Sequence, residues 1–189
     1  MAAADFKPAW WIASPHLQTL WPVFFKKRNK LNLLTEQVEL DDGDFIDLCW
    51  SQKDSTKTVL ILHGLEGDLH SHYVNGIIYR LERAGCRPVL MHFRGCSGRI
   101  NRLVRAYHSG ETGDLAFIVE HIRKKTGRHP YAAVGYSLGA NVLLKWLGET
   151  SEKNPLAKAV AVSVPLRLHD ASARLQLGAS KIYIVYLLS

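Results

Sequence analysis

One serine of the sequence stands in the pattern of a nucleophile. Ser137 is the centre of Gly135-Tyr136-Ser137-Leu138-Gly139, which lies between two apolar runs. In such a G-x-S-x-G pattern a strand turns sharply into a helix, and small residues on either side leave room for the turn. The pattern predicts a serine that attacks a carbonyl carbon. The alternative is a glycine turn in an ordinary α/β sheet, because G-x-S-x-G also occurs by chance.

Two backbone amides are candidates for an oxyanion hole, which stabilises the negative charge that develops when a serine attacks a carbonyl group. Leu138 opens the helix expected after Ser137, so its amide points to the place where that charge forms, and the helix dipole adds to the effect. The second amide is that of Leu65. It follows Gly64 in the loop "HGLEG", where the glycine lets the backbone approach the site closely.

Imidazole and guanidinium side chains occur on the loops expected to surround this serine. Three of them are candidates for contacting a substrate: His63, Arg94 and His108. Two interpretations are open for the arginines of the loop that begins at Arg94. They grip an anionic group of a substrate, or they pair with Glu111 and Asp114 and so brace a long loop. No carboxylate or thiol shares a metal-ligand spacing with the loop histidines, so no metal site and no cofactor are expected.

The elements that must position these residues follow from the hydrophobic pattern. Two strand-like runs at 35–40 and 45–50 flank the turn "DDGD", which predicts a hairpin. Continuous apolar runs predict further strands at 58–64, 88–93, 131–137 and 158–164, and helical spacing predicts helices at 72–84, 112–127 and 138–149. Alternating strands and helices predict an α/β fold, with a mostly parallel sheet, the antiparallel hairpin at one edge and helices on both faces.

The length and composition indicate one globular domain. The 189 residues are 47% hydrophobic and 22% charged, which excludes a disordered chain, and we expect an N-terminal arm at 1–34 before an α/β domain at 35–189. The formal charge is +7, but the densest basic run, 26–30, is too short to predict a nucleic-acid partner. Three cysteines without metal-ligand spacing suit reduced thiols in a cytoplasmic protein.

The N-terminal arm is rich in aromatic residues. No stretch approaches the roughly 18 apolar residues of a membrane span. Two interpretations are open for Trp10, Trp11, Trp21 and Phe24: they touch a membrane surface, or the arm packs on the domain.

Several motifs together resemble one family. They are "SPHLQTLWP", "DGDFIDLCW", "LHGLEGDLHSHY", "MHFRGCSG", "RAYHSGETGD" and "AVGYSLGANVL". The chain resembles the YheT-type esterases, a branch of the α/β-hydrolase superfamily, from about residue 15 to its last residue. The resemblance implies an α/β-hydrolase fold, a Ser-Asp-His triad and hydrolysis of carboxylic esters, either short-chain esters or acylglycerols. It assigns the nucleophile to Ser137, the oxyanion loop to "HGLEG" and a structural role to His63.

The acid and the base of that triad are not found in this sequence. In the family they follow two further strands, and the strands that would carry them are absent here. Beyond Ser137, His169 and Asp170 are the nearest to suitable chemistry, but adjacent residues cannot easily act in line. We therefore expect a C-terminally truncated serine esterase that is inactive as this chain. The alternative is a non-catalytic hydrolase scaffold that binds a partner or has no function.

Overall fold

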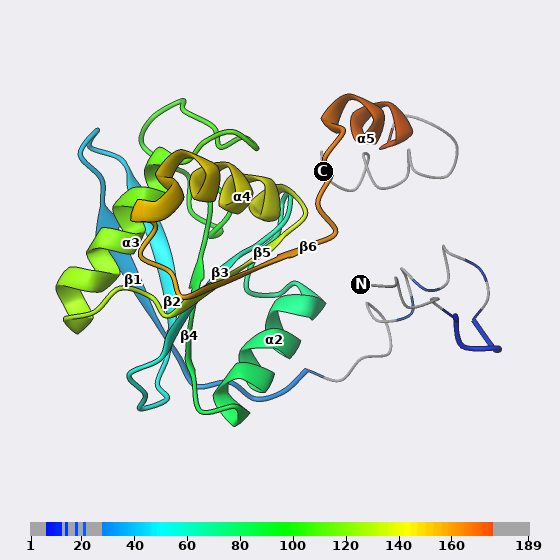
Figure 1. Cartoon of the computed structure of the whole chain (residues 1–189), viewed down its shortest axis with the longest axis horizontal. Coiled ribbons are helices and arrows are strands. Elements are labelled where there is room, and N and C mark those ends of the chain that lie inside the picture. Colours follow the sequence, from blue (N-terminus) through cyan, green and yellow to red (C-terminus); the bar gives the residue numbers. More distant parts are fainter. Residues whose placement is uncertain (1–6, 13, 15–17, 19–20, 22–27, 176–189) are drawn as a thin grey trace.

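The fold is built on one mixed β-sheet (Figure 1). The computed structural model describes residues 7–12, 14, 18, 21 and 28–175. The strands are β1 (Leu33–Glu39), β2 (Phe45–Ser51), β3 (Thr58–Leu62), β4 (Arg87–Met91), β5 (Ala132–Tyr136) and β6 (Lys158–Val162). Their order across the sheet is β1-β2-β4-β3-β5-β6, and β4, β3, β5 and β6 run parallel. The predicted mostly parallel sheet is confirmed.

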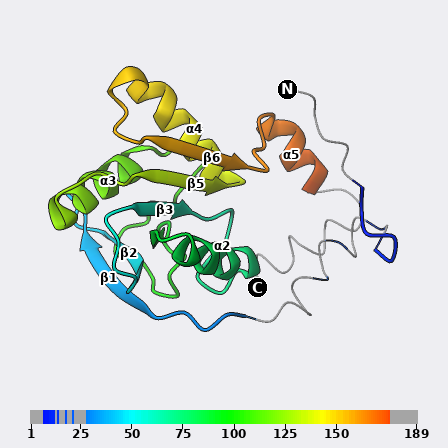
Figure 2. The same ribbon diagram turned by 60° about the horizontal axis from the view of Figure 1, so that its bottom comes forward.

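Helices cover both faces of the sheet. The described helices are α2 (His72–Arg83), α3 (Gly113–Thr126), α4 (Leu138–Thr150) and α5 (Leu168–Leu175), with a 3₁₀ turn at Ser151–Lys153. Helix α2 lies on one face, and α3 and α4 lie side by side on the other (Figures 1 and 2). Helix α5 follows the end of β6 and stands away from both layers (Figure 2).

The antiparallel hairpin forms one edge of the sheet, as the turn residues predict. Gly43 adopts φ +84°, a conformation that side chains disfavour, and so closes the turn between β1 and β2. Strand β2 then pairs antiparallel with β4 and joins the hairpin to the parallel strands. The first strand already begins at Leu33, two residues before the expected start of the domain.

Two apolar cores lie on opposite faces of the sheet. Side chains alternate along β3, so Leu60 and Leu62 pack into the core under α3 and α4, while Ile61 packs against α2. All three are fully buried, as expected of a central parallel strand. The cores fix the strands, and the loops at their carboxyl ends are therefore held on a rigid base.

The edge of the sheet at β6 is open. Its residues are exposed from Lys158 to Ala161, and Val160 keeps 51% of its accessible surface. An exposed apolar edge strand is unusual because its unpaired backbone groups invite further pairing.

Candidate active site

Ser137 lies on the turn between β5 and α4 in a strained backbone conformation. Its φ of 49° and ψ of −114° are uncommon for a residue with a side chain. The turn leaves no space for neighbouring side chains: a Cβ at Gly135 would lie 2.6 Å from the carbonyl oxygen of Gly139, and a Cβ at Gly139 would lie 2.7 Å from that of Leu62. Both glycines are therefore sterically required, as the G-x-S-x-G pattern predicts.

The backbone of Ser137 is held while its hydroxyl is left free. The amide of Ser137 donates to the carbonyl of Val162 at 2.9 Å, and its carbonyl accepts from the amides of Ala140 and Asn141 in the first turn of α4. The residue is half-buried. Its hydroxyl makes no hydrogen bond with any of the residues that the structure describes.

The two candidate oxyanion donors are available. Within the described part of the chain, neither the amide of Leu138 nor that of Leu65 donates to a protein acceptor. The loop that carries Leu65 lies beside the serine, since a Cβ at Gly64 would be 3.4 Å from the Cβ of Ser137. The fold thus brings together Ser137 and both predicted amide-bearing segments.

The side chain of His63 links the oxyanion loop to the end of β4. Its Nε2 accepts the amide of Phe93 at 3.0 Å, so its Nδ1 carries the proton and donates to the carbonyl of Gly64 at 2.7 Å. The ring is fully buried, and burial lowers the pKa of His63 to about 4, which keeps it neutral. Neither nitrogen is left for a substrate, so the structure gives His63 the structural role that the family resemblance implies.

Two tyrosines complete the support of this loop, and neither role was predicted from the sequence. The hydroxyl of Tyr73 in α2 accepts the amide of Gly64 at 2.9 Å. The hydroxyl of Tyr107 accepts the amide of Glu66 at 2.8 Å and donates to its carboxylate. Glu66 itself adopts a positive φ of 48°. Only the helical spacing of Tyr73 could have indicated that it packs toward the sheet.

Arg94 is buried among carboxylates and does not face a substrate. Its guanidinium contacts Asp114 at 2.7 Å and both Asp42 and Asp44 at 2.9 Å. The hydrogen bonds that Arg94 donates to Asp114 raise the pKa of Arg94 further above its already high value. Arg105 pairs with Glu111 at 2.6 Å. These contacts are those of the bracing interpretation, because Arg94 is buried and pairs with three carboxylates.

The remaining candidates are exposed. His108 lies on the surface, where its Nδ1 accepts the amide of Gly110 at 3.1 Å. The side chain of His169 is 96% exposed, and Asp170 pairs with Arg167 at 2.7 Å. Neither His169 nor Asp170 bonds to Ser137, so the structure does not bring this pair together with the serine as a triad.

The described part of the N-terminal arm exposes aromatic rings. Trp10 is 92% exposed, and the rings of Trp11 and Trp21 meet edge to face at 4.9 Å. Phe24 lies outside the described residues. Among the helices described, none has the length and apolar character needed to cross a membrane. No three His, Cys, Asp or Glu side chains in the described ranges are grouped to hold a metal ion.

Comparison with known proteins places this architecture in a family. The family described as "alpha/beta hydrolase fold" matches residues 57–181, and the chain belongs to it. The fold and the site therefore define an α/β hydrolase.

Individual relatives narrow the class. The Escherichia coli (strain K12) protein named "Putative esterase YheT" is 40% identical over 192 residues, covering 100% of this chain and 56% of that protein. "Phospholipase ABHD3" of Bos taurus is 30% identical over 168 residues, covering 84% of this chain and 41% of that protein. The chain is thus similar to proteins named as an esterase and a phospholipase, and it spans about half the length of the curated relatives it matches.

A solved structure supports the fold. The Pyrococcus furiosus esterase Pf2001 superposes with a TM-score of 0.66 at 22% sequence identity, covering 79% of this chain and 58% of that one. At this identity the similarity concerns the fold alone.

Proposed function

We propose that Ser137 is the nucleophile of a serine carboxylester hydrolase. The observation that carries this proposal is the strained backbone of Ser137 between two glycines that admit no side chain. A protein keeps such strain where surrounding structure enforces it, and strained residues cluster at functional sites. The free amides of Leu65 and Leu138 beside this serine give the strain a chemical purpose.

The mechanism follows from this arrangement. The Oγ of Ser137 attacks the acyl carbonyl carbon, and its proton passes to a general base. The carbonyl oxygen becomes an oxyanion, which accepts hydrogen bonds from the amides of Leu65 and Leu138. Collapse of the intermediate expels the alcohol with a proton and leaves an acyl-enzyme, which water then hydrolyses.

The acid and the base lie outside the described residues in this proposal. The hydroxyl of Ser137 has no partner among those residues, and a serine without a base is a poor nucleophile. Loss of the triad histidine costs several orders of magnitude in rate in other serine hydrolases. We therefore expect this chain by itself to hydrolyse esters very slowly or not at all.

The proposed substrates are small-molecule or lipid esters, either short-chain esters or acylglycerols. The names of two relatives, an esterase and a phospholipase, support this class. Free thiols at Cys49, Cys86 and Cys96 support a reducing, cytoplasmic location. The exposed ring of Trp10 supports contact with a membrane surface, which vesicle flotation of wild-type and Trp10→Ala protein would test.

A fluorophosphonate probe tests the assignment of Ser137. The probe phosphonylates serines that have a preorganised oxyanion hole, so slow labelling of Ser137 is expected even in this chain. Ser137→Ala should abolish the label. Ser163→Ala is the matched control, because Ser163 also has a positive φ (52°) but lies outside the G-x-S-x-G turn. Equal labelling of Ser137→Ala and wild type would refute the assignment.

A non-catalytic scaffold is the second candidate function. It is favoured by the free hydroxyl of Ser137 and by the exposed apolar surface of Val160 on β6. Such a scaffold would sediment as a single species, and Ser137 would not react with the probe, either in this chain or in a longer protein that contains it.

A further inference from the structure

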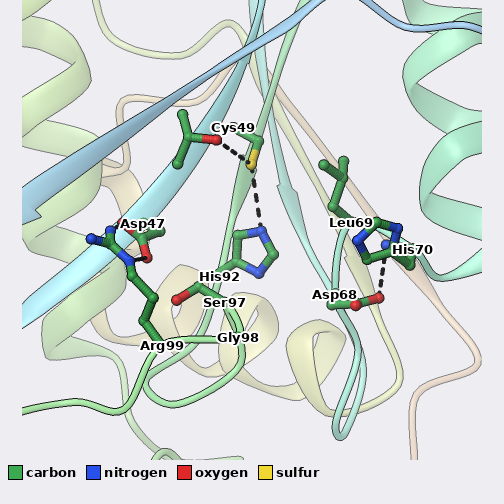
Figure 3. Close-up of a pocket in the computed structure, with 10 residues that line it drawn as sticks. Asp47, Cys49, Asp68, Leu69, His70, His92, Ser97, Gly98 and Arg99 are labelled. Carbon is green, nitrogen blue, oxygen red and sulfur yellow. Dashed lines mark hydrogen bonds and ion pairs between the residues drawn. The ribbon is translucent and has the colours of Figure 1, made fainter.

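A second nucleophilic side chain borders a cavity of about 260 Å³ (Figure 3). Cys49 of β2 and Thr35 of β1 line it from the sheet, and His92 lines it just beyond the end of β4. Asp68 contributes from the oxyanion loop, and Ser97 from the long loop after β4. Ser137 is not part of this cavity, so the cavity is separate from the site proposed above.

Cys49 and His92 form a nucleophile–base pair. The Sγ of Cys49 lies 3.5 Å from Nε2 of His92, and the two side chains face each other across the cavity in Figure 3. The Nδ1 of His92 lies 3.1 Å from the carbonyl oxygen of Cys96. A carbonyl can only accept, so Nδ1 carries the proton and Nε2 presents its lone pair to the thiol. A nucleophile, a base and a group that orients the base are therefore in line.

Both members of the pair are neutral at neutral pH. Burial raises the pKa of the Cys49 thiol and lowers the pKa of His92. Around them, Asp47 is ion-paired with Arg99, and Asp68 and His70 line the opposite wall. A free thiolate is therefore not stored in the cavity. The thiol can act only if His92 removes its proton while sulfur forms its new bond.

We propose that Cys49 and His92 capture small α,β-unsaturated carbonyl compounds that enter this cavity. The Sγ of Cys49 bonds to the β-carbon, and His92 Nε2 takes the thiol proton. The π electrons of the carbon–carbon double bond move toward the α-carbon and the carbonyl oxygen. The α-carbon then takes the proton back from His92, which leaves a saturated thioether and the neutral imidazole, with no oxidant or metal required.

The lining of the cavity suits this class of electrophile. Sulfur is a soft nucleophile and adds readily to the polarised double bond of such compounds. The hydroxyl of Thr35 lies 3.7 Å from the Cys49 sulfur, and that of Ser97 lines the same space, so each can donate to a carbonyl oxygen as it gains charge. The small volume and the burial of Cys49 exclude bulky reagents.

The test is acrylamide labelling of the folded chain, followed by mass spectrometry of each cysteine peptide. Cys96 is the buried comparison, and its sulfur faces no imidazole. We expect Cys49 to be labelled faster than Cys96, and His92→Gln to slow labelling of Cys49 about a hundredfold, the lower end of general-base effects. The rate at half-buried Cys86, which has no histidine partner, should stay the same and serves as the internal control.

A second variant protects the test against misfolding. If His92→Gln unfolds the protein, Cys96 also becomes reactive, and the outcome then rests on Ser97→Leu. This change fills the cavity and leaves Cys49 and His92 in place, so labelling of Cys49 should slow while that of Cys86 does not. The proposal is overturned if Cys49 reacts no faster than Cys96 in wild type. It is also overturned if the folded His92→Gln or Ser97→Leu variant labels Cys49 at the wild-type rate.

Discussion

Ser137 and Cys49 are nucleophilic side chains that the same sheet prepares in opposite ways. Ser137 stands on a strained turn at the end of β5, beside two free backbone amides, and its hydroxyl has no base among the described residues. Cys49 lies within the regular strand β2 and is nearly fully buried, with the imidazole of His92 beside its sulfur. One is prepared by backbone geometry and the other by a neighbouring side chain.

The difference shows that the two requirements of a nucleophile are separable. Part of the stabilisation of the oxyanion is local to a turn, because the amide of Leu138 needs only the glycines and a helix start, while the amide of Leu65 comes from another loop. A base must be brought from elsewhere by the fold. The oxyanion loop links the two regions, because it carries Leu65 beside Ser137 and Asp68 at the cavity of Cys49.

The largest expected effect concerns the ion cluster of Arg94, which joins the loop after β4 to the hairpin turn and to α3. Arg94→Met leaves the buried carboxylates of Asp44 and Asp114 without their cation, so the free energy of unfolding should fall by about 3–5 kcal/mol. Urea denaturation measures the change. Arg102→Met removes an exposed pair with Glu39 and should have little effect. Equal losses in the two variants would contradict the importance of burial.

Low pH should reduce the contribution that His63, which lies between the two nucleophiles, makes to the stability of the fold. The ring of His63 lies 5.9 Å from that of His92 and bonds to Gly64, and burial lowers the pKa of His63 from 6.5 to about 4. The unfolded chain therefore binds this proton more tightly than the folded one. The contribution of His63 to stability is full above pH 6.5 and is lost as the pH falls toward 4.

The expected loss from this histidine between pH 7 and pH 4 is about 3 kcal/mol of unfolding free energy. Urea denaturation at several pH values in this range gives the slope of the unfolding free energy against pH. The buried His92 adds to this slope in the same direction. His63→Gln should flatten the slope by about one proton. A slope that is the same in His63→Gln and wild type would show that His63 does not titrate in this way.

An added side chain in the turn at Ser137 should lower the free energy of unfolding by less, and it should affect the reactivity of Ser137. In Gly139→Ala the new methyl group meets the carbonyl oxygens of Leu62 and His63, which should lower the free energy of unfolding by about 1–3 kcal/mol. Fluorophosphonate labelling should fall as well, because the turn must shift. Gly148→Ala on the same helix meets no atom within 4 Å and should stabilise by about 0.5–1 kcal/mol. We expect the change in the free energy of unfolding to have opposite signs in the two variants.

The smallest effect tests whether strain distinguishes the two nucleophiles. Ser137→Gly relieves the positive φ and should stabilise the fold by about 1 kcal/mol, while Ser137→Ala keeps the strain and should not. Cys49→Ala removes a buried sulfur from an unstrained strand and should destabilise. Thermal unfolding compares the three. A destabilised Ser137→Gly variant would mean that the turn stores no strain.

Much of the fold could be predicted because its signals are local. The hairpin follows from Gly43 and from the alternation of the residues beside it. Helix α3 ends at Gly127, a glycine that adopts a φ of 76°. The pairing of Arg94 with Asp114 was among the expected interactions of its loop. Its contacts with Asp42 and Asp44 were not, because they arise only when β2 pairs with β4 and brings the hairpin turn to Arg94.

The candidate site was predictable in part for the same reason. Ser137 and Leu138 are neighbours in sequence, so one motif describes both. His63 was a candidate for substrate contact, but its two nitrogens are bound by groups at Gly64 and Phe93, and the second is 30 residues away. Tyr107 supports the oxyanion loop from 41 residues away, and no periodicity signals such a contact.

The sequence by itself determined much of the sharp turn at Ser137, since a side chain at Gly135 would meet Gly139 and Ala140 of the same short segment. The space at Gly139 depends on the fold, because a side chain there would meet the carbonyl groups of Leu62 and His63. The sequence also determined the alternation of strands and helices, because burial of one face imposes a period on the chain. Only the tertiary structure decided which groups face Cys49. Its partner His92 is 43 residues away and meets it through strand pairing. The proximity of this base to this nucleophile depends on the positions of two strands in the sheet, and no local sequence pattern specifies the order of strands.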